Sequence, residues 1–208
     1  MHSTLRMPSQ DFWNQRYDTP TYAYGEAPNV FFAHRLQSLK PGNLLSVCEG
    51  EGRNAIHAAQ NGWQSVAIDF SDAARQKAHQ LAKSKGTAIQ YIVANCSQLG
   101  YPAHRYDAVA LVYAHMSPED QALLFPKLYN SLKPGGHFIF EAFSSKQLGL
   151  ASGGPKQLDW LFTLQDLRTT WPDMHWVILE EAAVRLEEGS YHQGEAQVIR
   201  AFGQKPLS

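Results

Sequence analysis

The sequence predicts an α/β protein with a mainly parallel β-sheet covered by helices on both faces. First, short apolar segments alternate with segments of helical periodicity from residue 44 onward. Second, a glycine-containing turn at residues 49–54 directly follows the first apolar segment. Third, strand-like segments at residues 176–186 and 196–202 indicate an antiparallel C-terminal hairpin. Strands that alternate with helices pair in parallel and are buried on both faces of their sheet.

The N-terminal residues predict a helical cover over that sheet. They are rich in aromatic and turn-forming residues, and residues 13–17 are expected to close a short helix. Pro28 suits the first position of a second helix, which we expect to end near residue 39. We therefore treat the chain as a single domain (1–208), divided into an N-terminal helical cover (1–40) and an α/β core (41–208).

The core predicts five strands before the hairpin, at residues 44–48, 65–69, 88–94, 107–113 and 137–142. The connecting helices are expected at residues 53–60, from the cap Ser71 to Gly86, and from the cap Ser117 onward. Pro126 lies inside the last of these helices and predicts a kink or two short pieces. Residues 133–136, with the sequence Lys-Pro-Gly-Gly, predict a turn before the fifth strand.

A loop and one short helix are expected between the fifth strand and the hairpin. Residues 144–155 contain three glycines and no periodicity, which is typical of a lid or a binding loop. Thr163 and Asp166 have the spacing of a capping box and predict a helix to about residue 170. Residues 187–195 are expected to connect the two hairpin strands.

Composition excludes several classes of protein. Lys and Arg number 18 and Asp and Glu number 19, so there is no broad cationic field for nucleic acid or anionic lipid. The apolar runs are too short for a membrane span, and residues 1–6 lack the apolar centre of a signal peptide. Cys48 and Cys96 are too few for a disulfide scaffold, and the histidines lack metal-ligand spacing. We expect a cytoplasmic protein without a metal, a nucleic-acid partner or a membrane partner.

The chemistry is expected at the carboxyl ends of the first two strands, where open α/β sheets bind ligands. Gly50 and Gly52 let the backbone approach a ligand, and the next helix offers free N–H groups to an anionic group such as a carboxylate. Asp69 ends the second strand and can accept hydrogen bonds from both hydroxyls of a ribose. A tight turn and an ordinary surface acid are the structural alternative, but the combination favours a nucleotide-like ligand.

Charge indicates which nucleotide the turn binds. Counted from Gly50, the third glycine of a dinucleotide fingerprint is replaced by Ala55, which that fingerprint tolerates. Glu49 and Glu51 flank Gly50 and would repel a pyrophosphate. They suit a cationic ligand, such as a sulfonium that carries an amino group. The turn therefore favours S-adenosylmethionine (SAM) over a nicotinamide dinucleotide.

Seven short motifs are spread along most of the chain: Trp-Asn-Gln-Arg-Tyr (13–17), Tyr-Gly-Glu-Ala-Pro-Asn (24–29), Glu-Gly-Glu-Gly-Arg-Asn (49–54), Ile-Asp-Phe-Ser (68–71), Tyr-Asp-Ala-Val (106–109), Leu-Lys-Pro-Gly-Gly (132–136) and Glu-Gly-Ser-Tyr-His-Gln-Gly (188–194). In this order they resemble the class I SAM-dependent methyltransferases, in the group related to tellurite-resistance and thiopurine methyltransferases. The resemblance implies a Rossmann-like, seven-stranded sheet whose last strand is antiparallel. It also implies an enzyme with SAM as its cofactor, which methylates a small molecule such as a thiol or a chalcogen compound.

The resemblance also implies which residues bind SAM. Arg16 and Tyr17 would reach its methionine carboxylate, and backbone groups of Cys96 and Ser97 would bracket its adenine ring. The cofactor-binding residues expected in all are Arg16, Tyr17, Glu49, Gly50, Glu51, Gly52, Asn54, Asp69, Phe70, Asn95, Cys96, Ser97 and Tyr113.

The sequence departs from the family pattern in two places. Ser46, Cys48 and Glu49 stand where most relatives have an acid in the first strand and a Gly-Cys-Gly. Asn95 stands where an acid usually pairs with the adenine amino group, and its side-chain oxygen can still accept that hydrogen bond. Cys96 is expected to be a small buried thiol and not a catalytic one.

Four residues are candidates for catalysis on the acceptor side. Tyr22, with Tyr24, is expected to border the methyl group through its ring face. His115 follows the fourth strand beneath the methyl group and titrates near neutrality. Tyr191 and His192 lie in the hairpin connection and are expected to cover the substrate mouth. The structural alternatives are helix packing for the tyrosines near the N-terminus, a cap or solvent-facing position for His115, and an exposed turn for the hairpin pair.

Two other functions stay open from the sequence. A nicotinamide-dependent oxidoreductase would share the glycine turn and the following acid. A non-catalytic SAM-binding protein would share the whole fold, and the departures at Ser46 and Asn95 leave that alternative open. A monomer and a homodimer are both compatible with the sequence.

Overall fold

The computed structural model describes residues 9–208. Its strands are β1 (Asn43–Val47), β2 (Gln64–Asp69), β3 (Gln90–Val93), β4 (Tyr106–Val112), β5 (Leu132–Phe143), β6 (His175–Glu188) and β7 (His192–Gln204). Its helices are α1 (Gln10–Tyr17), α2 (Val30–Gln37), α3 (Arg53–Gln60), α4 (Asp72–Ser84), α5 (Pro118–Ser131) and α6 (Leu164–Thr170), with short 3₁₀ turns η1 (Ser145–Gln147) and η2 (Leu158–Trp160). The absence of a signal peptide was predicted from residues 1–6, which lie outside the described residues.

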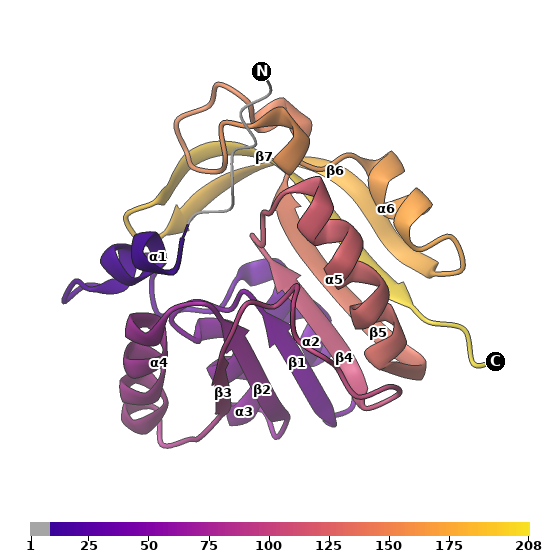
Figure 1. Ribbon diagram of the computed structural model, residues 1–208, viewed down its shortest axis with the longest axis horizontal. Coiled ribbons are helices and arrows are strands. Elements are labelled where there is room, and N and C mark those ends of the chain that lie inside the picture. Colours follow the sequence, from indigo (N-terminus) through magenta and orange to yellow (C-terminus); the bar gives the residue numbers. More distant parts are fainter. Residues whose placement is uncertain (1–8) are drawn as a thin grey trace.

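The seven strands form one twisted sheet in the order β3-β2-β1-β4-β5-β7-β6 (Figure 1). The strands from β3 to β5 pair in parallel, whereas β7 is antiparallel to both of its neighbours, β5 and β6. The predicted α/β class, the mainly parallel sheet and the C-terminal antiparallel hairpin are confirmed. The strand order reverses between β1 and β4, and ligands bind at such a switch point in open α/β sheets.

The central strands are buried on both faces, because alternate side chains point to opposite sides of a strand. Leu44 of β1 and Ala108 of β4 pack in one apolar cluster with Phe32 of α2. Their neighbours Leu45 and Val109 belong to the opposite cluster, whose other members include residues of α5 and α6: Leu124, Leu128 and Leu167. This alternation explains why the core strands read as continuous apolar segments.

Two predicted features near α5 differ in the structure. Pro126 lies on the exposed side of one continuous helix, so the prediction of two short pieces is wrong. The predicted turn at residues 133–136 is part of the long strand β5. These residues bulge out of the ladder, because the register jumps from Tyr106↔Leu132 to Ala108↔His137.

The helix α2 and the hairpin also begin at other residues than predicted. Asn29 caps α2 by accepting the Phe32 N–H at 2.9 Å, so Pro28 precedes the helix and is not its first residue. The hairpin strands run much further than predicted, and only residues 189–191 connect them. The β6–β7 ladder runs from the pair His175↔Gln204 to the pair Glu188↔His192, so most of the loop expected at 187–195 is paired strand.

The tip of the β6–β7 hairpin docks on the N-terminal segment. In Figure 1 the hairpin arches from the sheet toward α1. The Ser190 N–H donates to the Ala23 carbonyl at 3.0 Å, and Gly189 has φ +62° with the backbone of residues 23–25 against its Cα. Within residues 9–208, no helix has both the length and the apolar character needed to cross a membrane.

Candidate active site

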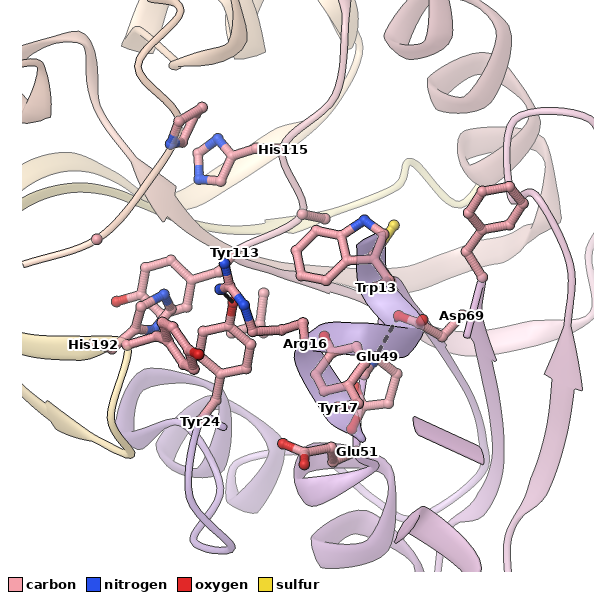
Figure 2. A pocket seen from close by; sticks show the side chains of 18 of the residues that line it. Trp13, Arg16, Tyr17, Tyr24, Glu49, Glu51, Asp69, Tyr113, His115 and His192 are labelled. Atoms are coloured by element: carbon pink, nitrogen blue, oxygen red, sulfur yellow. Dashed lines mark hydrogen bonds between the residues drawn. The ribbon is translucent and has the colours of Figure 1, made fainter. Parts of the chain in front are cut away.

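A cavity of about 550 Å³ lies at the carboxyl ends of the central strands. Its walls come from α1, the strand ends, the 153–160 segment and the hairpin tip. Figure 2 shows Glu49 and Asp69 toward one end of this pocket and Tyr24, Tyr113 and His192 toward the other. A volume of this size is within the range of small-molecule sites.

The structure brings most of the predicted site residues to this one cavity. Those that line it are Arg16, Tyr17, Glu49, Gly50, Glu51, Asn54, Asp69, Phe70, Asn95, Cys96, Tyr113, His115, Tyr191 and His192. Three predicted residues do not line it, namely Tyr22, Gly52 and Ser97.

Each of these three residues has a structural contact instead. The Tyr22 hydroxyl donates to the Lys77 carbonyl at 3.2 Å, away from the cavity, so Tyr22 does not border a methyl group there. Gly52 begins α3 at φ +88°, and a Cβ there would lie 2.8 Å from the Ala78 methyl group. Ser97 is 1% exposed, and its Oγ lies 2.6 Å from the Asp120 carboxylate.

Glu49 caps helix α3 from inside the fold. One carboxylate oxygen accepts the N–H groups of Asn54 and Ala55, both at 2.8 Å, and the other accepts the Ser46 hydroxyl. Burial raises the pKa of Glu49, against the opposing effect of these hydrogen bonds and of Arg53. The prediction that the first turn of α3 offers its N–H groups to a ligand is therefore wrong for those of Asn54 and Ala55, because Glu49 already accepts both.

Glu51 is also held by the protein. It forms a buried ion pair with Lys77 and accepts the Ala23 N–H at 2.8 Å. Burial raises the pKa of Glu51, although the Lys77 hydrogen bond and charge oppose that shift. The two acids beside Gly50 are thus not free carboxylates that await a cationic ligand, as the sequence suggested. They still exclude an anion from this end of the cavity.

Asp69 closes the turn between β1 and α3. Its two oxygens accept the N–H groups of Gly50, at 2.8 Å, and Ser71, at 3.0 Å, and it also lines the cavity. Burial raises its pKa, against those backbone hydrogen bonds. Gly50 has φ +59°, and a Cβ there would lie 2.8 Å from the Tyr17 hydroxyl, so only glycine allows α1 to approach this closely.

The helix α1 carries an aromatic wall with one cation. The Arg16 guanidinium lies 3.9 Å from the centre of the Tyr191 ring and donates to the Tyr24 hydroxyl at 3.1 Å. Trp13 stacks on Tyr17 with their ring centres 5.7 Å apart. These contacts place Arg16 at the junction of α1 and the hairpin tip.

The strand ends contribute two residues with strained backbones. Cys48 and Tyr113 directly follow β1 and β4, and each has φ +54°, a region that L-residues rarely adopt. Such strain concentrates at ligand sites. The Cys48 Sγ lies 3.6 Å from the Cys96 Sγ, and the hydrogen bond with Cys96 together with burial raises the pKa of the Cys48 thiol. Cys96 itself is 5% exposed, which agrees with the expectation of a small buried thiol.

Asn95 makes an internal turn at the cavity wall. Its side-chain oxygen accepts the Ser97 N–H at 3.0 Å. The Ser97 Oγ lies 2.9 Å from the same oxygen and 2.6 Å from the Asp120 carboxylate. Because a hydroxyl has one proton, the second lone pair of Asn95 is open to a ligand donor when Ser97 donates to Asp120.

His115 has both ring nitrogens engaged by the backbone. Nδ1 lies 2.9 Å from the Trp160 carbonyl and Nε2 accepts the Phe143 N–H at 3.2 Å. Burial lowers the pKa of His115 to about 4. A proton-transfer role does not fit this residue, because its basic lone pair is already occupied.

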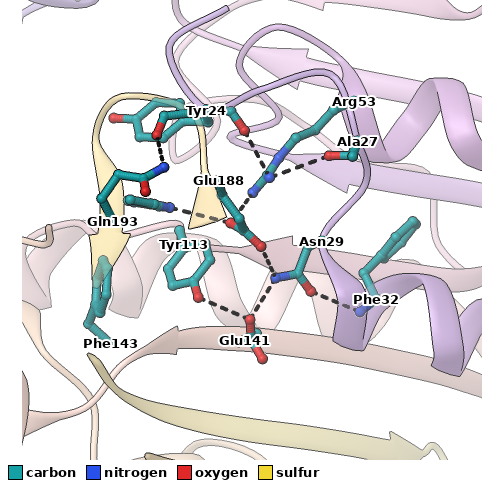
Figure 3. A network of polar contacts seen from close by, with 12 residues as sticks. Tyr24, Ala27, Asn29, Phe32, Arg53, Tyr113, Glu141, Phe143, Glu188 and Gln193 are labelled. Atoms are coloured by element: carbon teal, nitrogen blue, oxygen red, sulfur yellow. Dashed lines mark hydrogen bonds and ion pairs between the residues drawn. The ribbon is translucent and has the colours of Figure 1, made fainter. Parts of the chain in front are cut away.

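The hairpin and the N-terminal segment meet in a buried polar network (Figure 3). Asn29 donates to Glu141 at 2.6 Å and to Glu188 at 3.1 Å, and the Tyr113 hydroxyl donates to Glu141 at 3.0 Å. The Arg53 guanidinium pairs with Glu188 at 2.7 Å. The network fixes the acceptor end of the pocket, because it joins α2, α3, β4, β5 and β6.

Several residues that line the cavity were not singled out as site residues from the sequence. They include Phe12, Trp13, Gly25, Cys48, Arg53, Ala94, Val112, Phe143, Gly153, Gly154, Pro155, Gln157 and Trp160. The glycines of the 144–155 loop were the one available signal for this wall. Across residues 9–208, no group of three or more His, Cys, Asp and Glu side chains is arranged to hold a metal ion.

The cavity fits SAM better than a dinucleotide. A dinucleotide places its pyrophosphate on the first turn of the helix after β1. Here the Glu49 carboxylate fills that position. Along the cavity, Asp69 offers a hydrogen-bond acceptor for a ribose and Asn95 one for an adenine amino group. Arg16 offers a cation for a carboxylate.

Comparisons with known proteins agree with this geometry. Residues 44–136 match the family model of a methyltransferase domain. The C-methyltransferase UbiE of ubiquinone and menaquinone biosynthesis from Geotalea daltonii is 24% identical over 149 residues, which cover 69% of this chain and 62% of that protein. The chain therefore spans less than two thirds of the length of this relative.

Two solved structures share the fold. The first comes from a study of the conversion of a disulfide bond into a thioacetal group during echinomycin biosynthesis. Its TM-score is 0.74 at 16% sequence identity, and the match covers 96% of this chain and 93% of that chain. TehB from Haemophilus influenzae has a TM-score of 0.70 at 14% identity, covering 94% of this chain and 66% of that chain. The domain match and these likenesses show that residues 44–136 form a methyltransferase domain within the fold that the two structures share, and they agree with the predicted resemblance to the class I SAM-dependent methyltransferases.

Proposed function

We propose that this protein transfers the methyl group of SAM to a small-molecule acceptor at the hairpin end of the cavity. The observation that carries the proposal is the Glu49 carboxylate on the N-terminal amides of α3, which leaves no anion site for a pyrophosphate. SAM supplies a methyl group on a sulfonium, and its transfer leaves a neutral thioether. The protein therefore needs to position the acceptor and exclude water more than to supply a strong acid.

The chain would hold SAM with side chains from three regions. Asp69 accepts hydrogen bonds from the ribose, Asn95 and Cys96 border the adenine, and Arg16 with Tyr17 closes over the methionine end. The remaining contacts are expected from residues that line the cavity between these points: Glu49, Gly50, Glu51, Asn54, Phe70 and Tyr113.

The acceptor end of the cavity favours a neutral molecule. Its walls include the rings of Tyr113, Phe143, Trp160 and Tyr191, and His115 is neutral because burial lowers its pKa to about 4. A chalcogen oxyanion would need cationic partners, and the guanidinium of Arg53 is already paired with Glu188. Between the two acceptor types expected from the sequence, these walls support a thiol over an oxyanion.

Calorimetry with SAM and S-adenosylhomocysteine tests the proposal directly. Both should bind, and Asp69→Ala should weaken binding at least about tenfold, because a buried hydrogen bond to a charged group contributes about 1.5–3 kcal/mol. Asp72→Asn is the matched control, since this acid lies three residues on with half of its side chain exposed. NADH should give no heat. If NADH binds and SAM does not at millimolar concentration, the proposal is wrong.

The remaining expectations concern location and assembly. The balanced charge supports a protein without a nucleic-acid partner, and the free cysteines Cys48 and Cys96 support a reducing, cytoplasmic setting. A monomer and a homodimer are distinguished by light scattering at working concentration.

A further inference from the structure

We propose that His192, positioned by Glu188, is the general base of this site, and that the acceptor is an aromatic molecule whose methylated oxygen or sulfur carries a proton. The inference rests on the proposed methyl transfer and goes beyond it by assigning the base and the acceptor class.

His192 lies inside an aromatic cage that opens on the cavity. Its ring centre is 4.4 Å from that of Tyr113, 4.6 Å from that of Tyr24 and 5.3 Å from that of Phe143. The side chain is 5% exposed and lines the cavity. Three aromatic rings in tilted or edge-on contact therefore hold the imidazole in place, and its hydrogen bonds can be made only through its two nitrogens.

The two edges of the imidazole have different surroundings. Nδ1 lies 3.5 Å from the Glu188 carboxylate, which is itself held by Arg53 and Asn29. Cδ2, the carbon bonded to Nε2, lies on the side of Gly153, where a Cβ would come within 2.9 Å of it. Among residues 9–208, Nε2 has no hydrogen-bond partner. A proton on Nδ1 leaves the Nε2 lone pair free to accept another, as a carboxylate-oriented base requires.

The second histidine of the cavity serves as an internal contrast. His115 lines the same cavity, but its Nε2 already accepts the Phe143 N–H and its Nδ1 faces the Trp160 carbonyl. Of the two histidines, His192 alone has a nitrogen that is free to take a proton from an acceptor.

The pKa of His192 is lowered overall, mainly by burial, so the imidazole is neutral at rest, while the Glu188 carboxylate beside Nδ1 stabilises the cation that proton transfer creates. Burial lowers the pKa of His192, Glu188 and Glu141 raise it, and Arg53 lowers it. Burial alone would raise the pKa of Glu188, but His192 and Arg53 bring it to about 2, so Glu188 is ionised. The titratable and charged groups that face the imidazole are Glu188 of β6, Glu141 of β5, Arg53 of α3, Tyr113 after β4, Tyr24 before α2 and the nearby His115.

The reaction balances with these groups alone. The O–H or S–H bond of the acceptor breaks, and its proton goes to Nε2 of His192. The electron pair left on oxygen or sulfur forms the new bond to the methyl carbon, while the bond from that carbon to the donor sulfur breaks and its pair stays on that sulfur. The imidazolium is paired with Glu188 and releases its proton to water as the products leave.

The walls beside His192 indicate an aromatic acceptor. Phe143 stacks on His115 with 19° between their planes and 5.5 Å between ring centres, and Tyr113 lies 4.8 Å from Phe143. Such ring faces gain more from a flat aromatic ligand than from an aliphatic one.

The first test reads the imidazole without any acceptor. In ¹⁵N-labelled protein without SAM, the ring nitrogens of His192, assigned from the signals that His192→Gln removes, should report the neutral form protonated on Nδ1 at pH 7.5. In Glu188→Gln that preference should weaken. A proton on Nε2 of the wild-type protein would overturn the assignment of the base.

The second test uses 2-naphthol and 2-naphthalenethiol, which have one shape but different acidity. At pH 8 the thiol is already ionised and the naphthol is not, so only the naphthol needs a base. His192→Gln should lower naphthol methylation at least about 100-fold and change thiol methylation only a few-fold. The exposed His34→Gln on α2 should leave both rates unchanged.

The outcomes separate the two proposals. Equal losses on both probes overturn the base, and no methylation of either probe by the wild-type protein overturns the acceptor class. If calorimetry with S-adenosylhomocysteine shows no binding to the wild-type protein, it is the methyl-transfer proposal itself that fails.

Discussion

At the scale of single residues, Glu49 shows how one side chain changes what a turn can bind. A helix that follows the first strand of such a sheet normally presents its free amides to a ligand. In this chain a carboxylate placed one residue before Gly50 folds back onto those amides. The anion site is thus filled from within, and the cavity beside it is left for a ligand without phosphate.

Gly189 is the residue on which hairpin docking depends. Its φ is +62°, and an added Cβ would lie 2.3 Å from the Ala23 carbonyl oxygen. Gly189→Ala should therefore lower the free energy of unfolding by about 3 kcal/mol, from backbone strain and overpacking together. Gly86→Ala is the control, because φ is +67° there with no atom within 4 Å, and it should cost only about 1 kcal/mol. Equal losses in urea unfolding would mean that the tip is not docked.

Glu188 should make the protein sensitive to acid. Its pKa is about 2 in the folded protein against an ordinary value of 4.5, so its ionised form stabilises the fold above pH 4.5, and that stabilisation is lost as the pH falls toward 2. The free energy of unfolding of Glu188→Gln should therefore lie up to about 3 kcal/mol below that of the wild-type protein at pH 7, and this difference should fall to less than half near pH 3 and vanish only below pH 2. Urea unfolding at several pH values measures this difference.

The neighbour Glu187 provides the control for that titration. Its side chain is 77% exposed, and within residues 9–208 its one ion pair is a 3.6 Å contact with the exposed Arg185. Glu187→Gln should change the free energy of unfolding little at any pH. A gap between wild type and Glu188→Gln that stays constant with pH would contradict the assigned role of Glu188.

At the scale of elements, Pro126 tests how α5 is stabilised. The residue lies inside the helix, so the Ala122 carbonyl has no N–H partner four residues on. Pro126 is exposed, and Pro126→Ala should raise the free energy of unfolding by about 1–3 kcal/mol. Pro118 begins the same helix, where a missing N–H costs nothing, so Pro118→Ala should give no gain. Equal gains in thermal unfolding would show that the helical hydrogen bond is not the cause.

The elements themselves were largely predictable from local signals. The helix Arg53–Gln60 was predicted with its exact bounds, since glycines and Asn61 mark its two ends. The full lengths of β6 and β7 were not predicted, because their paired ends include the polar residues Glu187, Glu188 and Gln193. A strand end that pairs only with its hairpin partner need not alternate apolar and polar residues, so it gives no strand signal. The bulge at 133–136 was read as a turn for a similar reason, since Pro-Gly-Gly is typical of both.

The site was predictable where it follows strand ends and not where it depends on distant contacts. Asp69 ends β2, and Asn95 and Tyr113 come just after β3 and β4, so their place in the cavity follows from topology. Whether Glu49 caps α3 depends on its side-chain torsion angles, which cannot be predicted from the spacing of residues in the sequence. The pairing of Arg53 with Glu188 joins residues 135 positions apart, and no local pattern marks such a contact.

At the scale of the whole molecule, Asn29 joins the two parts that enclose the cavity. Its side-chain oxygen caps α2, while its amide group donates to Glu141 and to Glu188. Asn29 is 1% exposed, so water does not replace these bonds if they are lost. The N-terminal segment and the β6–β7 hairpin are thus coupled through one buried amide.

Asn29→Asp isolates that coupling, because aspartate keeps the cap of α2 but replaces the donor with a third carboxylate against Glu141 and Glu188. The free energy of unfolding should fall by about 3 kcal/mol, and the amides of residues 22–25 and 189–192 should exchange hydrogen faster together. The backbone amides of α6, which packs against β6 away from the cavity, should keep their hydrogen-exchange rates. Thr163→Ala is the reciprocal control, since it removes the cap of α6 and should affect only that helix. Faster exchange on one side of the cavity alone would mean that the cover and the hairpin open independently, and that the network in Figure 3 does not couple them.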